Sequence, residues 1–69
     1  MVDFYTRKTI AYNKIGELIS KGRSVKEIQF EIMETFGFAK VFVNKYLADA
    51  ESNGFLKVLG DGRIEIIKK

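Results

Sequence analysis

Two adjacent helical segments with sharply marked ends constrain the fold of this chain more than any other feature of its sequence. The first begins at Ser24, and Glu27 follows three residues later, which is the spacing of a capping box. After this start, apolar residues recur at helical spacing and share one face: Val25, Ile28, Ile32 and Phe36. Gly37 then stands where a helix commonly ends, because glycine adopts a left-handed conformation at low cost. The pattern predicts a helix over 24–36 and a tight turn after it.

The second segment is predicted to run from about Lys40 to Asn53, and Gly54 ends it. Its apolar stripe consists of four residues spaced by one, three or four positions: Val43, Tyr46, Leu47 and Ala50. Ala39 occupies the N-cap position, and its side chain cannot accept a hydrogen bond. Two helices joined by so short a turn are a candidate helix-turn-helix, which spans about residues 24–53.

A further helix is expected before this pair, from about Arg7 to Lys21. Thr6 or Thr9 is the expected N-cap, and Gly22 follows the expected C-terminus. The predicted buried stripe of this helix consists of five residues at helical spacing: Ile10, Ala11, Ile15, Leu18 and Ile19.

The last part of the chain predicts a β-hairpin, because two β-rich runs flank the turn Gly60-Asp61-Gly62. A three-residue loop places Lys57 opposite Glu65, whereas a two-residue loop places it opposite Ile66. Opposite charges across the two strands favour the three-residue loop. This register also gathers four apolar residues on the face that we expect to pack on the helices: Leu56, Val58, Ile64 and Ile66.

The composition fits one small domain, residues 1–69, and argues against several classes of function. A chain of 69 residues is long enough for one hydrophobic core and too short for two. It contains no Cys and no His, which removes thiol nucleophiles, the commonest general base and the commonest transition-metal ligand. No apolar run approaches the roughly 20 residues of a membrane span. We therefore expect an intracellular, cytoplasmic protein that is not an enzyme and holds neither a metal nor a cofactor.

Over about residues 7–67 the sequence resembles the winged-helix family of DNA-binding regulators, and the residues that carry the resemblance most clearly begin at Gly37. Gly37 and Phe38 match the turn ahead of the family's recognition helix, and Val43 and Leu47 match its buried pair. Four residues match the exit from that helix into the wing: Glu51, Gly54, Phe55 and Leu56. The resemblance implies an α+β winged helix, with a three-helix core and a C-terminal two-stranded hairpin over about residues 55–67 as the wing.

The resemblance also implies a surface that binds double-stranded DNA. The helix over 40–53 would enter the major groove with its outward face, which carries Lys40, Val41, Asn44, Lys45 and Ala48. Asparagine pairs with adenine, lysine reaches guanine or a phosphate, and valine contacts the methyl group of thymine. Just past the hairpin turn, Arg63 is a candidate contact to the minor groove or the backbone. The plain alternative is an ordinary solvated surface.

Three positions depart from the family pattern and favour a second interpretation. Ala39 stands where Ser or Thr is usual, and Val41 and Phe42 stand where polar residues are usual. On this interpretation the chain is a protein-interaction winged helix, a subunit of a transcription or replication complex. We expect Phe42 to be half-buried beside Tyr46. The leading hypothesis remains a sequence-specific DNA-binding protein that regulates transcription, and RNA binding on the same basic surface is a third interpretation.

A homodimer is expected because the net charge of +3 is modest, and one domain that contacts few phosphates binds DNA weakly. Phe30 lies off the apolar stripe of its helix, so either the N-terminal residues fold over it or it marks a contact between copies. We favour an interface made by Phe30 together with Phe4 and Tyr5. A stand-alone winged helix of this size, rich in Ile and Lys, is similar to archaeal or viral regulators.

Overall fold

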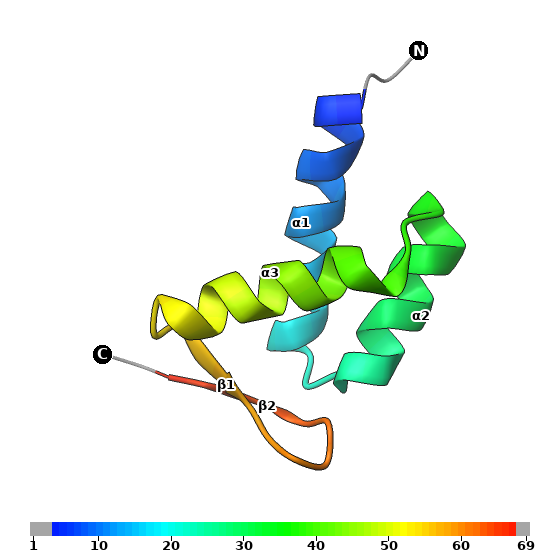
Figure 1. Cartoon of the computed structure of the whole chain (residues 1–69). Coiled ribbons are helices and arrows are strands. Elements are labelled where there is room, and N and C mark those ends of the chain that lie inside the picture. The colour runs from blue at the N-terminus through cyan, green and yellow to red at the C-terminus, as the bar shows by residue number, and fades with distance from the viewer. Residues whose placement is uncertain (1–3, 68–69) are drawn as a thin grey trace.

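The computed structural model describes residues 4–67, which form three helices followed by a two-stranded antiparallel sheet (Figure 1). This α+β arrangement is consistent with a winged-helix-like fold and confirms the predicted fold class. The elements, in chain order, are α1 (Phe4–Ser20), α2 (Val25–Phe36), α3 (Lys40–Ser52), β1 (Leu56–Val58) and β2 (Ile64–Ile66).

The helix α1 starts at Phe4, about one turn earlier than the predicted start at Arg7. Thr6 and Thr9 therefore lie inside the helix, and the prediction that one of them is the N-cap is wrong. The hydroxyl of Thr9 instead donates to the carbonyl oxygen of Tyr5, at 3.0 Å. Both threonines resemble caps in the sequence because the same hydroxyl can bond backbone groups at a helix start or within a helix.

The helix α2 begins and ends as the sequence predicts. The Ser24 hydroxyl accepts from the backbone N–H of Glu27 at 3.3 Å, and the Glu27 carboxylate accepts from the backbone N–H of Ser24 at 3.0 Å. The capping box is thus complete. Gly37 follows the helix with φ 75°, in the left-handed region, and its N–H donates to the Met33 carbonyl oxygen.

The helix α3 starts at Lys40, as predicted, and ends at Ser52. Ala39 has an extended N-cap conformation (φ −69°, ψ 163°), but no side-chain hydrogen bond caps the helix. Packing therefore positions this helix. Val43 and Leu47 are buried in the core that α1, α2 and β1 complete.

The hairpin has the predicted register, with Lys57 opposite Glu65 and the apolar pairs on either side of it. The N–H of Leu59 donates to the carbonyl oxygen of Arg63 at 2.8 Å, which closes the three-residue loop. A second backbone bond runs from the N–H of Val25 to the carbonyl oxygen of Gly62, also at 2.8 Å. The hairpin turn is thereby tied to the start of α2.

One hydrophobic core joins the three helices and β1, and it contains most of the residues that the sequence predicts. Its buried members include Ile15, Leu18, Ile19, Ile28, Ile32, Val43, Leu47 and Leu56, and Ala11 is buried as well.

Two predicted core residues are exposed instead. Ile10 is 47% exposed, because it precedes the buried Ala11 by one position and so faces about 100° away from it. Ile66 is 48% exposed, because α3 packs on β1 and leaves β2 as the outer strand. Its partner across the sheet, Leu56, is the member of that pair that enters the core.

Candidate nucleic-acid interface

The outward face of α3 is open along its length. All five of its predicted contact residues are solvent-exposed: Lys40, Val41, Asn44, Lys45 and Ala48. Val41, Lys45 and Ala48 lie on the side opposite the buried pair Val43 and Leu47. Asn44 lies at the edge of that side, and Lys40 is exposed at the start of the helix. Val41 is 71% exposed, so an apolar side chain sits among polar ones with little from the described chain covering it. The structure thus presents the predicted face of α3 to any partner.

Asn44 is held by a residue of α2 that the sequence analysis did not include in the site. The side-chain Nε2 of Gln29 donates to Oδ1 of Asn44 at 2.6 Å. This bond orients the Asn44 amide and leaves its NH₂ group and one lone pair on Oδ1 for another partner. Those two groups are the ones that an asparagine uses to bind adenine. The only sequence signal for Gln29 was its position at the edge of the apolar stripe, next to the helix that follows.

The hairpin turn carries Arg63, whose charge is partly neutralised by Asp61 within the turn. The Nε of Arg63 donates to Oδ2 of Asp61 at 2.7 Å, and the backbone N–H of Arg63 donates to Oδ1 at 3.1 Å. These bonds, the backbone one first, hold the pKa of the Asp61 carboxyl below its ordinary value. The Arg63 side chain is 75% exposed, and the NH₂ groups of its guanidinium remain available. Because exposed ion pairs are weak, a phosphate can compete with Asp61 for Arg63.

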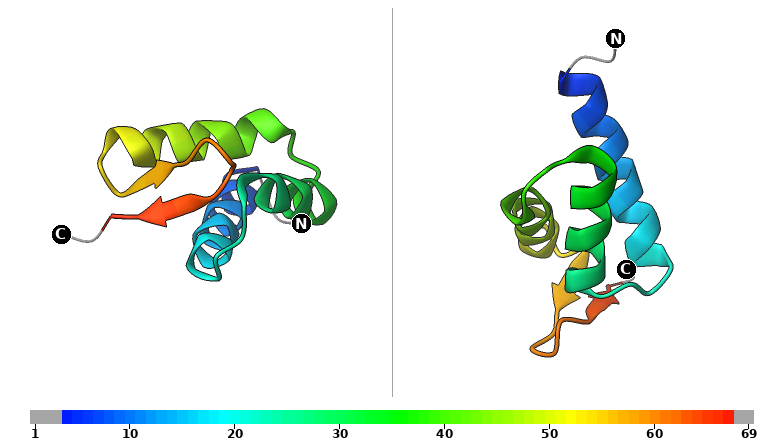
Figure 2. Two further views of the ribbon diagram at one scale, coloured as in Figure 1. Left: turned by 90° about the horizontal axis from the view of Figure 1, so that it is seen from below. Right: turned by 90° about the vertical axis from the view of Figure 1, so that its right-hand side faces the viewer.

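A shallow hollow connects the hairpin turn to α2. It is lined by residues from the start of α2 and from the turn: Ser24, Val25, Lys26, Gln29, Gly60, Asp61 and Gly62. Gln29 borders this hollow and also bonds Asn44, so the face of α3 continues through α2 to the hairpin turn. The right-hand view of Figure 2 places α3 and the turn on one side of the molecule and α1 on the other.

The joined surface is basic. Lys26, Lys40, Lys45 and Arg63 contribute positive charges to it. Its acidic residues include Asp61 in the hollow and Asp49, which is exposed four positions after Lys45 on the same side of α3. Two of the glutamates of α2 lie elsewhere, because Glu27 and Glu31 line a separate hollow that is also bordered by Leu18 of α1. The acidic side of α2 therefore does not oppose a polyanion on the α3 side. Lys26 is a further cation that the sequence analysis did not assign to this surface.

Phe42 belongs to a stack of rings that fixes the start of α3. Its ring centroid lies 4.4 Å from that of Phe38 and 5.0 Å from that of Tyr12, and both ring pairs are stacked. Phe36 extends the stack beyond Phe38, and Tyr46 packs against Tyr12 from the side. This confirms the prediction that Phe42 is half-buried beside Tyr46. Its ring faces are covered, so they offer no platform for a base.

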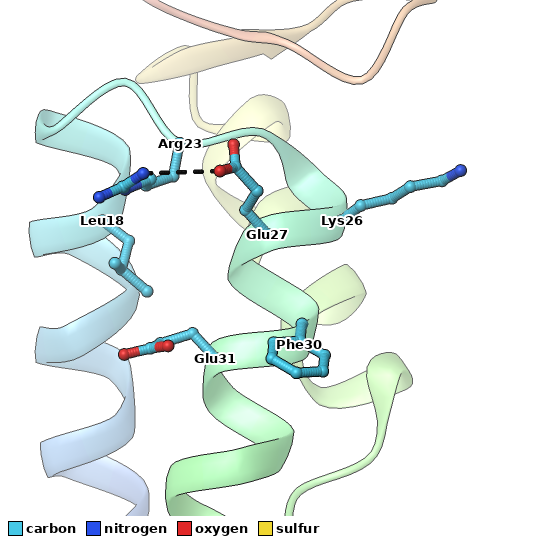
Figure 3. A pocket seen from close by; sticks show the side chains of 6 residues that line it. All are labelled: Leu18, Arg23, Lys26, Glu27, Phe30 and Glu31. Atoms are coloured by element: carbon cyan, nitrogen blue, oxygen red, sulfur yellow. Dashed lines mark ion pairs between the residues drawn. The ribbon is translucent and has the colours of Figure 1, made fainter.

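Tyr5 and Phe30, two of the residues predicted to form an interface, do not lie together within one chain. Phe30 is 63% exposed and, together with Leu18 of α1, is among the residues that line the hollow between α1 and α2 (Figure 3). Tyr5 is in the first turn of α1, and thirteen residues of helix, or about 20 Å, separate it from Leu18. Tyr5 is 79% exposed and does not fold over Phe30. The side chain of Phe4 lies outside what the structure describes.

Within residues 4–67, no cluster of three or more acidic side chains is arranged to hold a metal ion. None of the helices there is both long enough and apolar enough to cross a bilayer. This surface presents cationic side chains, amide groups and one exposed valine to a partner. No protein family, curated protein or solved structure was found to match this chain.

Proposed function

We propose that this chain is a winged-helix protein that binds double-stranded DNA inside the cell and regulates transcription. The observation that carries the proposal is the continuity of one basic surface from the exposed face of α3, through Gln29, to the hairpin turn. A helix presented in this way fits the major groove, and the hairpin then lies over the flanking backbone.

The groups on this surface divide into two roles. Asn44, oriented by Gln29, and Val41 are suited to contact base edges, the first on adenine and the second on the thymine methyl group. Lys26, Lys40, Lys45 and Arg63 are suited to contact phosphates, which position the protein without reading sequence. The start of α3 adds to this role, because no side chain caps it and helix N-termini favour phosphate.

Variants with opposite expected effects test the proposal. Lys45→Ala and Arg63→Ala should each weaken binding to a labelled duplex and lower the salt slope by about one unit, because each removes a phosphate contact. Asp61→Ala should tighten binding, because it frees the Arg63 guanidinium from its internal partner. Fluorescence anisotropy measures all three.

The control is Lys21→Ala, which removes the same charge just after the end of α1 and outside the assigned surface. Lys21 pairs with Glu17 at 2.9 Å, so this variant loses only a surface ion pair. Equal effects of Lys21→Ala and Lys45→Ala on DNA affinity would show that binding follows net charge and not the assigned surface.

The exposure of Val41 favours a second candidate function, a protein-interaction winged helix within a larger assembly. Phe42 lends it no support, because its ring is occupied by Tyr12 and Phe38. The two functions are separated by Val41→Ser. This change removes an apolar contact that a protein partner would bury, but it leaves the phosphate contacts and most of the DNA affinity in place.

A further inference from the structure

The outer face of α2 carries a stripe of three exposed residues, Lys26, Phe30 and Glu34, spaced four positions apart. Residues four apart lie one above the other on a helix, so the three form a continuous ridge. Phe30, at the centre of the ridge, is 63% exposed. Met33, another apolar residue of α2, is 40% exposed. The ridge has an aromatic centre, a cation at one end and an anion at the other.

Within the described part of the chain, the charged side chains at the two ends of this ridge form no ion pairs. Neither Lys26 nor Glu34 forms an ion pair with another residue in 4–67, whereas Glu27 of the same helix pairs with Arg23 at 3.5 Å. Figure 3 shows Lys26 extending away from α1, while Glu31 points towards it. The ridge is thus open to an external partner.

The arrangement is complementary to itself. When two copies of a helix pack antiparallel about a two-fold axis through Phe30, the residue four positions before Phe30 meets the residue four positions after it in the other copy. Lys26 then faces Glu34 of the second copy, Glu34 faces Lys26, and the two phenylalanines meet at the axis. A two-fold contact requires a surface of this self-matching kind.

We infer that α2 is the contact between two copies of this chain, with Phe30 at the two-fold axis and two Lys26–Glu34 ion pairs beside it. The biological use of this contact rests on the proposed function, since a two-fold pair of DNA-binding domains reads two half-sites. The contact surface itself consists of residues of α2 alone. It replaces the N-terminal segment as the partner of Phe30.

This contact leaves the face of α3 and the hairpin turn open, and it shares Lys26 with the proposed DNA surface. The centre of the ridge, Phe30, lies about 100° around the axis of α2 from Gln29, the residue that bonds Asn44 of α3. Lys26 borders both surfaces, because it lines the hollow next to Gly60 and Gly62 as well as the one next to Phe30. Glu34 lies two turns further along α2, away from the hairpin turn.

The contact is small, so the dimer is expected to be weak in free solution. A single aromatic pair with two ion pairs lies well below the roughly 1,200 Å² of a stable interface, and we expect a dissociation constant of about 0.1–1 mM. Two copies bound to neighbouring half-sites have a high effective concentration, which converts this weak contact into cooperative binding.

The test is a charge swap measured without DNA, by sedimentation equilibrium and NMR diffusion at protein concentrations up to the low millimolar range. Lys26→Glu places a second carboxylate against Glu34, and Glu34→Lys places two lysines together. Each variant alone should therefore self-associate at least about tenfold more weakly than wild type. An equimolar mixture of the two variants should regain the association, because the contact between unlike variants joins opposite charges. The double variant Lys26→Glu/Glu34→Lys should regain it as well.

Phe30→Ala should weaken association by about 30-fold or more, as expected for a central aromatic contact. The matched control is Lys45→Glu, which makes the same charge change on an exposed helix position of α3 and should leave self-association unchanged. Wild-type protein that stays monomeric at low millimolar concentration would overturn the inference, as would single variants that associate like wild type or a mixture that fails to recover.

Because these measurements contain no DNA, their outcome is independent of the proposed function. DNA binding by the monomeric Phe30→Ala variant, measured on a single half-site, tests the proposed function separately. Intact half-site binding together with failed self-association in wild type would reject the α2 contact alone. Normal self-association without DNA binding would reject the proposed function alone.

Discussion

The helices α2 and α3 begin in opposite ways. α2 begins at a capping box, in which Ser24 and Glu27 each bond a backbone N–H of the other. α3 begins at Ala39, where no side chain caps the helix. Packing supplies what the cap does not, because Phe42 in the first turn of α3 is stacked between two other rings. The difference shows that local sequence specifies α2, whereas contacts between distant segments specify α3.

The largest expected effect comes from breaking the packing of α3. Phe42→Ala should lower the free energy of unfolding by roughly 2 kcal/mol, somewhat less than the loss of a fully buried phenylalanine. Urea denaturation measures this change. The control is Val41→Ala, because Val41 is the neighbouring residue, is 71% exposed and should contribute less than about 0.5 kcal/mol. Equal losses in the two variants would contradict the view that ring stacking holds α3.

Removing the cap of α2 is expected to have the next largest effect. Ser24→Ala leaves the N–H of Glu27 without its side-chain acceptor and should cost about 1 kcal/mol of unfolding free energy. The same urea experiment applies, with Ser52→Ala at the exposed end of α3 as the matched control. A Ser24→Ala protein as stable as wild type would mean that packing, and not the cap, specifies α2 as well.

Adding a cap to α3 tests whether a side-chain hydrogen bond can also stabilise the start of this helix. Ala39→Ser should raise the free energy of unfolding by about 0.5–1 kcal/mol. The gain is expected because Ala39 already has the extended N-cap conformation, so the serine oxygen can accept a backbone N–H without moving the chain. Thermal unfolding followed by circular dichroism measures the gain. No gain would show that the start of α3 is held too rigidly by its packing to use a cap.

The smallest expected effect is the pH dependence of the α2 cap. The pKa of the Glu27 carboxyl lies below its ordinary value, first because it accepts the backbone N–H of Ser24. A lowered folded-state pKa means that the ionised form stabilises the fold, and that this contribution is lost as pH falls through the folded pKa. The stability difference between wild type and Glu27→Gln should therefore be present at neutral pH and shrink in acid. A difference that is independent of pH would exclude this role for the carboxylate.

The features that the sequence predicted correctly are those set by neighbouring residues. The capping box at Ser24, the left-handed Gly37 and the uncapped Ala39 each depend on a few adjacent positions. The hairpin register follows from the turn and from the Lys57–Glu65 pairing across it. The buried stripes of α2 and α3 follow from helical spacing, which is why the outward face of α3 was placed correctly.

The features that the sequence did not predict depend on segments that meet only after folding. The Gln29–Asn44 bond joins side chains fifteen residues apart, and no periodicity indicates it. The exposure of Ile10 depends on which side of α1 the other helices cover. The Asp61–Arg63 pair is local, but spacing alone does not show that the aspartate turns back onto the arginine instead of facing solvent.

The measurement that tests the central claim most directly is the salt dependence of DNA binding. Fluorescence anisotropy of a labelled AT-rich duplex is recorded with wild-type protein at salt concentrations from low to physiological. The basic surface of Lys26, Lys40, Lys45 and Arg63 predicts that the logarithm of affinity falls linearly with the logarithm of salt concentration, with a slope of about −3 to −4 per bound chain. No binding at low salt, or an affinity that salt does not change, would contradict the assignment of this surface to DNA.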